Sequence, residues 1–215
     1  MQALRNIWDL DVSTNLSKSI TPRQKGRPRT FDRNKAIEAC ISLFWKNGYE
    51  ATSIGMICEL LNIGPASFYA AFGTKRSFFE LVLERYEAIY WKPLLEQFES
   101  TPNIKEALRD FFSGAAKIMT ANSDALGCLI AITASERDGS VSKMSQSKRI
   151  GLQTLFLKRL NEAQASNQLK LTLPADVVAQ ALLAMISGMS INAKNGMQYQ
   201  EVLKVADAAL FLISD

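Results

Sequence analysis

The chain has 215 residues, of which 47% are hydrophobic and 21% charged, a composition typical of a globular protein and not of a disordered one. It contains no histidine and three cysteines without CxxC spacing, so we expect no histidine-based triad, no metal site, no cofactor and no disulfide framework. The net charge is +4, and seven basic residues between Lys18 and Lys35, against a single acid, account for that excess.

The basic segment contains the run Gly26-Arg27-Pro28-Arg29. We expect this run to be extended, because Pro28 cannot continue a helix. Arginines on an extended segment suit the negative potential of a DNA minor groove. We therefore predict a flexible basic arm over residues 1–25, followed by DNA contacts from Arg27 and Arg29; a solvated tail is the alternative.

Helical periodicity begins after this arm. Apolar residues recur at helical spacing over residues 33–47, with Asp32 as N-cap and Gly48 as the stop. A second helix is predicted over 54–61, capped by Thr52 or Ser53, and Asn62 is expected to adopt a left-handed conformation in the turn that follows. A short third helix is predicted over 65–72 and a fourth from residue 75, capped by Thr74.

The remainder of the chain is predicted to be helical as well, which makes the fold class all-α. Helices are expected from residue 104, around residues 152–160, over 175–192 and over 200–213, with a less regular stretch at 124–139. The apolar run between Asp176 and Lys194 is long enough for a membrane span, but polar residues interrupt it. We interpret it as a buried helix of a soluble protein and expect no membrane partner.

Three short helices with a tight turn between the second and third predict a helix-turn-helix. Small residues on the third helix let its backbone approach base edges, whereas Phe68 and Phe72, spaced i, i+4, should anchor it inward. The Tyr69 hydroxyl is placed to reach a phosphate, and Lys75 follows at the start of the next helix, where a phosphate is also attracted.

At these residues the sequence resembles the TetR family of bacterial transcriptional regulators. The resemblance is carried by the run from Phe44 to Ser53 and by the run from Ile63 to Lys75, within a similar stretch that covers residues 26–90. It implies phosphate contacts from Ser53, Tyr69 and Lys75. It also implies a base-facing set on the third helix, and the flanking caps complete the predicted DNA-binding residues: Pro65, Ala66, Ser67, Ala70, Ala71, Thr52 and Thr74.

Two positions depart from the family pattern: Asn62 replaces the usual glycine of the turn, and Gly64 replaces the usual polar cap of the third helix. The third helix also carries no long base-reading side chain. We therefore expect modest direct readout, from Ser67 and alanine methyl groups, with arm and shape readout supplying the rest.

The resemblance further implies the domain plan and the partners. A helix-turn-helix DNA-binding domain is expected over 26–75, a connecting helix over 76–90, and a C-terminal domain for effector binding and dimerisation over 91–215. The implied protein is a cytoplasmic, nucleoid-associated homodimeric repressor. It would bind a palindromic operator and be released by a small effector.

The C-terminal residues suggest a pocket and an interface. Because charged residues are scarce in the middle helices, we expect an apolar or amphipathic effector there. The candidate lining residues are Trp91, Phe98, Phe112, Met119, Cys128, Met144 and Phe156. The candidate dimer-interface residues on the last two helices are Val178, Ala181, Leu182, Met185, Met189, Val202, Ala206, Ala209 and Leu210. Packing inside the monomer is the alternative for both sets.

Three other interpretations remain open at this point. Cys128 suggests a regulator that senses oxidants or electrophiles through its thiol. The close acid pairs Glu84/Glu87 and Glu136/Asp138 suggest catalysis, although solvated helix faces and a loop explain them better, and no enzyme is expected. A helical adaptor that binds a partner helix would show no salt-dependent affinity for DNA.

Overall fold

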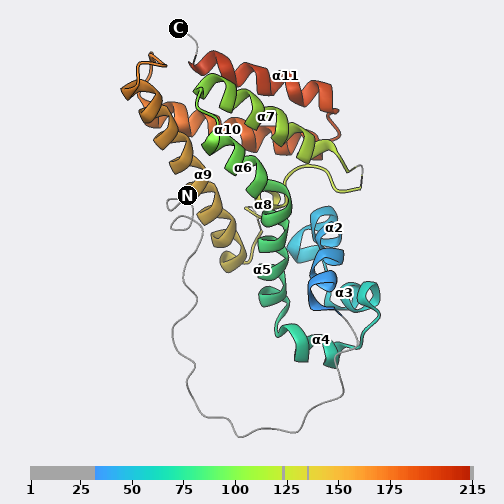
Figure 1. Ribbon diagram of the computed structural model, residues 1–215. Coiled ribbons are helices and arrows are strands. Elements are labelled where there is room, and N and C mark those ends of the chain that lie inside the picture. Colours follow the sequence, from blue (N-terminus) through green and yellow to red (C-terminus); the bar gives the residue numbers. More distant parts are fainter. Residues whose placement is uncertain (1–31, 123, 135, 214–215) are drawn as a thin grey trace, which may run out of the picture.

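The computed structural model describes residues 32–122, 124–134 and 136–213, and the described part of the chain contains helices and no strand (Figure 1). The predicted arm, with Arg27 and Arg29, lies outside the described residues. The elements in chain order are α2 (Arg33–Ala51), α3 (Ile54–Leu61), α4 (Pro65–Phe72), α5 (Lys75–Tyr86), the π-helical segment η1 (Glu87–Trp91), α6 (Lys92–Ser100), α7 (Ile104–Thr120), α8 (Leu129–Thr133), α9 (Gly139–Ala165), α10 (Ala175–Lys194), α11 (Tyr199–Ala209) and the 3-10 segment η2 (Leu210–Ile213).

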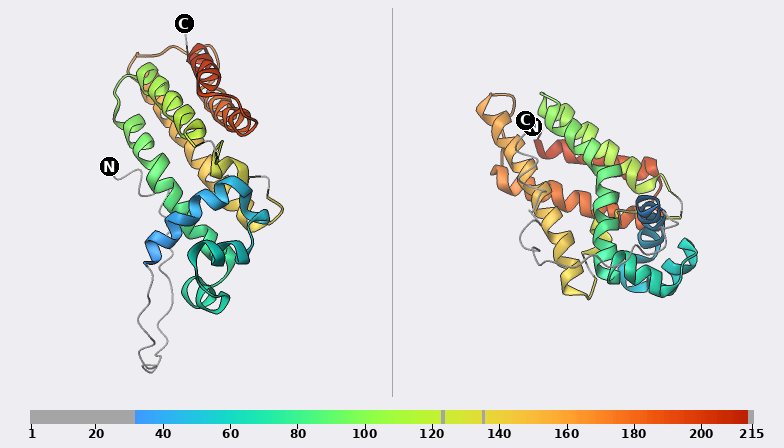
Figure 2. Two further views of the ribbon diagram at one scale, coloured as in Figure 1. Left: turned by 90° about the vertical axis from the view of Figure 1, so that its right-hand side faces the viewer. Right: turned by 60° about the horizontal axis from the view of Figure 1, so that its bottom comes forward.

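Helices α2, α3 and α4 form one end of an elongated molecule, which we call the head (Figures 1 and 2). The predicted caps are confirmed: Asp32 accepts from the Asn34 N–H, and Ser53 accepts from the Met56 N–H at 3.1 Å. Thr74 and Ser77 form a capping box at the start of α5. Because these short polar side chains satisfy free backbone N–H groups, the helix starts follow from the sequence alone.

The helical trace of α2 extends beyond the stop predicted at Gly48. Gly48 has φ +79° and ψ 177°, a conformation open only to glycine, so the helix does break there. A further turn, Tyr49–Ala51, then resumes before the cap of α3. The sequence predicted the break but not this short restart.

The head is joined to the rest of the molecule, which we call the body, by one continuous helical rod (Figure 1). This rod is α5, η1 and α6, so the connecting helix predicted to end at residue 90 continues to Ser100. The wider π turn precedes Pro93, which lacks an N–H group and crowds the carbonyl one turn earlier. The Lys92 N–H accordingly bonds to the Glu87 carbonyl, five residues back.

The body packs α7 against α6, α10 and α11, and α10 against α9 (Figure 2). Helix α9 has 27 residues and is much longer than the segment predicted around 152–160, because polar residues fill its first turns. Its N-cap Asp138 accepts from the Ser140 N–H, which fixes the start. The irregular stretch predicted at 124–139 contains the five-residue helix α8.

Helix α10 is long and apolar enough to cross a membrane, judged by length and composition. No other unbroken helix in the described ranges meets this criterion. It contacts α7, α8, α9 and α11, and its residues Val178, Leu182 and Met189 are buried among them. This packing is that of a core helix in a helical bundle, and one such helix is weak support for a span.

Candidate DNA interface and effector pocket

The turn between α3 and α4 sets α4 at the end of the head. The two helix axes differ by 95°, which lies in the range of helix-turn-helix motifs. Asn62 has φ 51° and ψ 48°, so the predicted left-handed conformation is confirmed. The Ile63 N–H donates to the Cys58 carbonyl at 3.0 Å and closes the turn.

Helix α4 is anchored from inside by aromatic rings. Phe68 and Phe72 are buried, with ring centroids 5.2 Å and 4.5 Å from that of Phe78 on α5. Arg33 lies 5.5 Å over the Phe72 ring. Rigid anchoring of one face lets the opposite face of α4 be presented in a fixed orientation.

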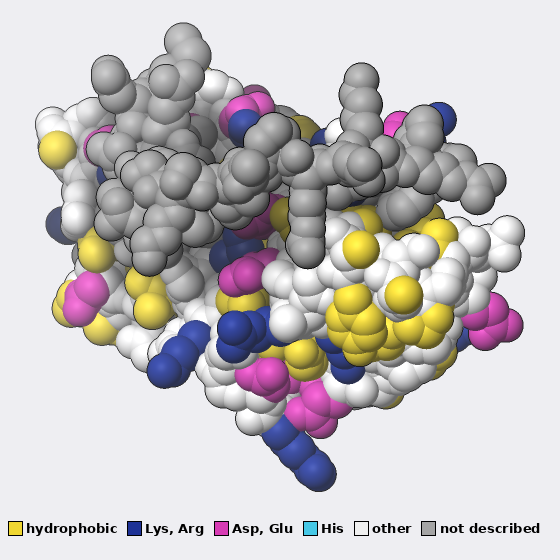
Figure 3. Space-filling model, turned by 90° about the horizontal axis from the view of Figure 1, so that it is seen from below, with side chains coloured by type: hydrophobic (Ala, Val, Ile, Leu, Met, Phe, Trp, Pro, Cys, Tyr) yellow, Lys and Arg dark blue, Asp and Glu magenta, His cyan; other side chains and the backbone are white. Residues whose placement is uncertain are grey.

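The outward face of α4 is exposed and small. Its exposed members are Pro65, Ala66, Ser67, Tyr69 and Ala70, whereas Ala71 is half-buried. Tyr69 is the largest of them and is 54% exposed. Seen from the α4 end, the molecule shows a cluster of apolar side chains, with both basic and acidic side chains beside it (Figure 3).

The flanking polar residues divide into exposed and buried ones. Ser53 and Thr74 are exposed, and Lys75 is half-buried. The Lys75 ammonium lies 4.3 Å from the centroid of the Tyr49 ring, and burial lowers the pKa of its side chain, against the opposing effect of Glu136. The Lys75 ammonium also donates to the Glu50 carbonyl at 3.4 Å.

The prediction that Thr52 contacts DNA is wrong. Its side chain is fully buried and its hydroxyl donates to the Gly48 carbonyl at 2.7 Å. This bond secures the turn after the Gly48 break, so Thr52 offers no exposed atom to DNA. Sequence reasoning grouped it with Ser53 because either residue type can cap α3, and the structure assigns the cap to Ser53.

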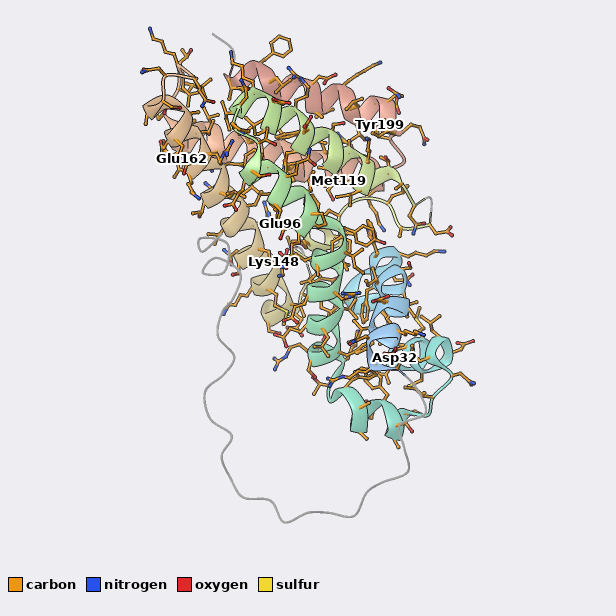
Figure 4. The ribbon with its side chains drawn as sticks, in the orientation of Figure 1. Asp32, Glu96, Met119, Lys148, Glu162 and Tyr199 are labelled. Carbon is orange, nitrogen blue, oxygen red and sulfur yellow. The ribbon has the colours of Figure 1, made fainter. Side chains whose placement is uncertain are left out.

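A second candidate site is a cavity of about 50 Å3 in the body, between the rod, α8, α9 and α10. Its exposed walls are almost entirely apolar, although four residues with polar or charged side chains on η1, α9 and α10 are among those that line it. The lining residues are Glu87, Trp91, Leu95, Cys128, Ile130, Ala131, Lys148, Arg149, Leu152, Leu183, Ile186 and Ser187. Lys148 faces the rod from α9 and forms an ion pair with Glu87, and both side chains are less than one-fifth exposed (Figure 4).

The structure brings only two of the residues predicted for the pocket, Trp91 and Cys128, to this cavity. Four others lie in the core, and Met144 is half-buried against it: Phe98, Phe112, Met119 and Phe156 are at most 1% exposed. The Phe98 and Phe156 rings pack edge to face at 5.6 Å, and the Phe112 and Phe156 rings stack at 6.3 Å. These aromatic residues build the interior because their large apolar surfaces gain most from mutual burial.

Sequence reasoning missed the polar lining residues Glu87, Lys148 and Arg149. It assigned charged residues on helices to solvated faces. The helical spacing of Lys148 and Arg149 could have identified them. Both lie one turn before Leu152, on the face of α9 that buries Val141 and Ser145.

Cys128 is buried at the start of α8, and burial raises the pKa of its thiol. A thiol held protonated is a poor nucleophile, so the thiol-sensing interpretation is not favoured. Cys40 and Cys58 are also buried and free, and burial raises the pKa of Cys40 to about 12. The Tyr86 hydroxyl is in hydrogen-bonding contact with the Cys128 thiol and accepts from the Trp91 indole N–H at 3.2 Å.

The head is held to the body by a set of hydrogen bonds at the end of α2, which we call the joint. The Glu136 carboxylate accepts from the Tyr49 N–H at 2.7 Å and from the Glu50 N–H at 3.4 Å. The Trp45 indole N–H donates to the Gly127 carbonyl at 3.0 Å, and the Lys194 ammonium donates to the Lys46 carbonyl at 2.9 Å. Glu136 therefore caps the short turn after Gly48, a role that its position in a loop did not reveal.

The joint and the cavity share one short stretch of chain. Cys128, Ile130 and Ala131 line the cavity, and Gly127 and Glu136, on either side of them, bond to the head. A change in the position of α8 would therefore reach both sites.

The dimer interface predicted from sequence is wrong for most of its residues, because they are buried inside the protomer. Six are at most 3% exposed: Val178, Leu182, Met189, Val202, Ala206 and Ala209. Ala181, Met185 and Leu210 are half-buried. Helix α10 is apolar nearly all round, so periodicity did not distinguish its inward face from its outward one.

The outward face of α10 carries a different apolar stripe. Val177 is 44% exposed and Ile191 60% exposed, and Ala181, Ala184 and Gly188 lie between them at helical spacing. A Cβ atom added to Gly188 would meet no atom within 4 Å, so the surface there is open.

Residues 36–82 match the family model described as bacterial regulatory proteins of the tetR family. The chain is 28% identical to the HTH-type transcriptional repressor ComR of Escherichia coli (strain K12), over 91% of this chain and 95% of that protein.

Solved structures extend the similarity over most of the chain. The TetR family transcriptional regulator CifR, as a cysteine mutant complexed with 26-bp operator DNA, aligns with a TM-score of 0.82 and 26% identity, over 88% of this chain and 100% of that one. A putative TetR transcriptional regulator from Rhodococcus sp. RHA1 is 31% identical, with a TM-score of 0.56, over 85% of this chain and 98% of that one.

Proposed function

Because the chain belongs to the TetR family of bacterial transcriptional regulators, we propose that it is a homodimeric repressor that binds operator DNA through α4 and is released by a small effector. The observation that carries the DNA-binding function is the exposed small-residue face of α4, held at 95° to α3 by a left-handed Asn62. The repressor relatives and the operator complex of CifR support the same function.

In this proposal α4 enters the major groove and its backbone approaches the bases closely, since Ala66 and Ala70 add little bulk. Ser67 supplies a hydroxyl to a base edge, and alanine methyl groups meet thymine methyls. Ser53, Tyr69 and Lys75 contact phosphates and fix the orientation. Arg27 and Arg29, beyond the described residues, follow the adjacent minor groove.

A negative charge introduced on α4 tests this placement. Ala70→Asp adds a carboxylate to an exposed position and removes no packing, so the fold should persist while affinity for operator DNA falls at least tenfold. The matched control is Ala88→Asp, at an exposed position on η1 outside the head. Equal DNA affinity of the two variants in a gel-shift titration would contradict the proposal.

The homodimer is proposed through the outward stripe of α10, which shares only Ala181 with the interface residues selected from sequence. A twofold copy would cover Val177 and Ile191, and the small residues Ala184 and Gly188 between them let two α10 helices approach closely. Two heads in one dimer would then meet two half-sites about one helical turn apart.

The oligomeric state tests this interface. Ile191→Glu should give a folded monomer in sedimentation equilibrium, because it places a charge on the most exposed apolar residue of the proposed contact. Leu60→Glu changes an apolar residue of the head that is 49% exposed and should leave the dimer intact. A dimeric Ile191→Glu protein would refute the interface.

The effector is proposed to occupy the cavity beside α8. Occupancy would bias the position of α8 and so act on the joint at Gly127 and Glu136, which changes how the head is held. Release of DNA requires that the effector bind the DNA-free arrangement more tightly than the DNA-bound one. We propose a cytoplasmic location, at the nucleoid, as befits such a regulator.

A further inference from the structure

The ammonium group of Lys75, proposed above to contact a phosphate, is held by the short turn that follows Gly48. It lies 4.3 Å from the centroid of the Tyr49 ring and donates to the Glu50 carbonyl at 3.4 Å. The Lys75 side chain is half-buried, so these two contacts restrict where its charge can lie. The position of the Lys75 ammonium therefore depends on the position of this turn.

The turn, Tyr49–Ala51, is fixed from the body as well as from the head. Its first two N–H groups, those of Tyr49 and Glu50, donate to the Glu136 carboxylate at 2.7 Å and 3.4 Å. In return, the Glu50 carboxylate accepts from the Arg137 N–H at 2.6 Å. Each glutamate thus satisfies backbone donors of the other segment, as a capping residue does at a helix start.

Gly48 leaves room for the Glu136 carboxylate. A Cβ atom at position 48 would lie 2.8 Å from the Glu136 Oε1 atom, so any other residue would push the carboxylate away from the Tyr49 N–H. The backbone of Gly48 also has φ +79°, which glycine adopts most readily. The residue that breaks α2 is therefore also the one that admits the capping carboxylate.

Glu136 is tied to the helix that lines the cavity. Its N–H donates to the carbonyl of Thr133, the last residue of α8, at 3.3 Å, and the Thr133 hydroxyl donates to the Leu129 carbonyl. Ile130 and Ala131 of the same helix line the cavity. The group that holds the turn beside Lys75 is thus carried by α8.

We infer that Glu136 is a positioning residue for DNA binding: it acts through the Tyr49–Ala51 turn to hold the Lys75 ammonium where a phosphate can meet it. This inference rests on the proposed function and gives a residue of the body a part in operator affinity. It also separates the acid pair that the sequence suggested for catalysis, since Asp138 caps α9 whereas Glu136 caps the turn.

Two substitutions separate the contact from the charge. Glu136→Gln and Glu136→Ala remove the same negative charge, which by itself favours DNA binding equally in both. Only glutamine keeps an oxygen that can accept from the Tyr49 N–H. We therefore expect Glu136→Ala to bind DNA more weakly than Glu136→Gln by about threefold or more. Its log–log salt slope should be shallower by up to about 0.9, the contribution of one phosphate contact.

Affinity is measured by fluorescence anisotropy on the DNA fragment from upstream of the protein's own gene, and Lys75→Gln supplies the background that decides the route. If Glu136 acts through Lys75, the two Glu136 variants should bind equally once residue 75 carries no charge. A general loss of stability would instead weaken Glu136→Ala in either background. Equal affinities in the parent background, or a threefold difference that persists in Lys75→Gln, would overturn the inference.

A spectroscopic readout needs no DNA. The Lys75 Cε methylene adjoins an ammonium 4.3 Å from the Tyr49 ring centroid, so the ring should shift its NMR signal upfield, and Lys75→Gln assigns that signal. We expect Glu136→Gln to keep the shift and Glu136→Ala to lose much of it. An unchanged shift in Glu136→Ala, shown to be folded by circular dichroism, would overturn the inference.

The two proposals fail separately. Operator binding by the parent chain, with equal affinities for Glu136→Ala and Glu136→Gln, overturns only the role of Glu136. Absence of operator binding by the parent chain overturns the proposed function as well.

Discussion

Glu136 is predicted to hold the head to the body, so Glu136→Ala should loosen the joint. The substitution removes a carboxylate that accepts from the Tyr49 N–H at 2.7 Å and from the Glu50 N–H at 3.4 Å. A hydrogen bond to a charged group contributes about 1.5–3 kcal/mol, and the longer, exposed bond contributes little. We therefore expect the free energy of unfolding to fall by about 2 kcal/mol.

Glu136→Gln separates the charge from the contact. The amide oxygen of glutamine still accepts from the Tyr49 N–H, so the free energy of unfolding should fall by about 1 kcal/mol, the difference between a charged and a neutral acceptor. The control is Glu96→Ala on α6, an exposed glutamate (Figure 4) for which the described structure shows no hydrogen bond or ion pair. Surface substitutions of this kind change the free energy of unfolding by about 0.5 kcal/mol or less.

Two assays measure the effect, urea denaturation for the free energy of unfolding and hydrogen exchange for its location. A joint weakened by about 2 kcal/mol should speed exchange of the Tyr49 and Glu50 amides by about thirtyfold where local opening controls it. Amides of Phe111, in the core of the body, should change far less. Equal unfolding free energies and equal exchange rates for Glu136→Ala and Glu96→Ala would show that Glu136 does not hold the joint.

Three further predictions concern the arm, the buried thiol and the joint. Deleting residues 1–28 should weaken DNA binding and flatten its salt dependence, by about 0.9 in the log–log slope for each phosphate that the arm neutralises; an unchanged slope would count against the arm. Because burial raises the pKa of the Cys128 thiol, native protein at pH 8 should react with iodoacetamide far more slowly than urea-unfolded protein, and equal rates in mass spectrometry would show an accessible thiolate. Gly127→Ala should lower the free energy of unfolding by more than about 1 kcal/mol, since φ at Gly127 is +81° and the new Cβ would lie 2.8 Å from the Ser190 carbonyl oxygen. A stability equal to the parent's would show that the backbone there can shift to accommodate the Cβ.

Local chemistry made the head predictable from sequence. Asn62 is one of the few residue types that adopt a left-handed backbone, and Ser53 and Thr74 satisfy helix N–H groups within three residues of themselves. Phe68 and Phe72 fall on one face of α4 by spacing alone. Each of these features depends on neighbours along the chain, and each is present in the structure.

The body was less predictable because its features depend on residues far apart in sequence. Glu136 bonds to an amide 87 positions away, and Lys148 pairs with a carboxylate 61 positions away. No local pattern distinguishes such charges from solvated ones. Aromatic residues were selected for the pocket by size, but size also favours the core, where Phe98 and Phe156 lie.

The most direct test of the central claim is fluorescence anisotropy of the full chain on a DNA fragment from upstream of its own gene. A scrambled duplex of the same composition is the control, and both are titrated across a salt series. We expect the protein to prefer the native fragment, with an affinity that falls steeply as salt rises. Absence of binding to either duplex at low salt would contradict it.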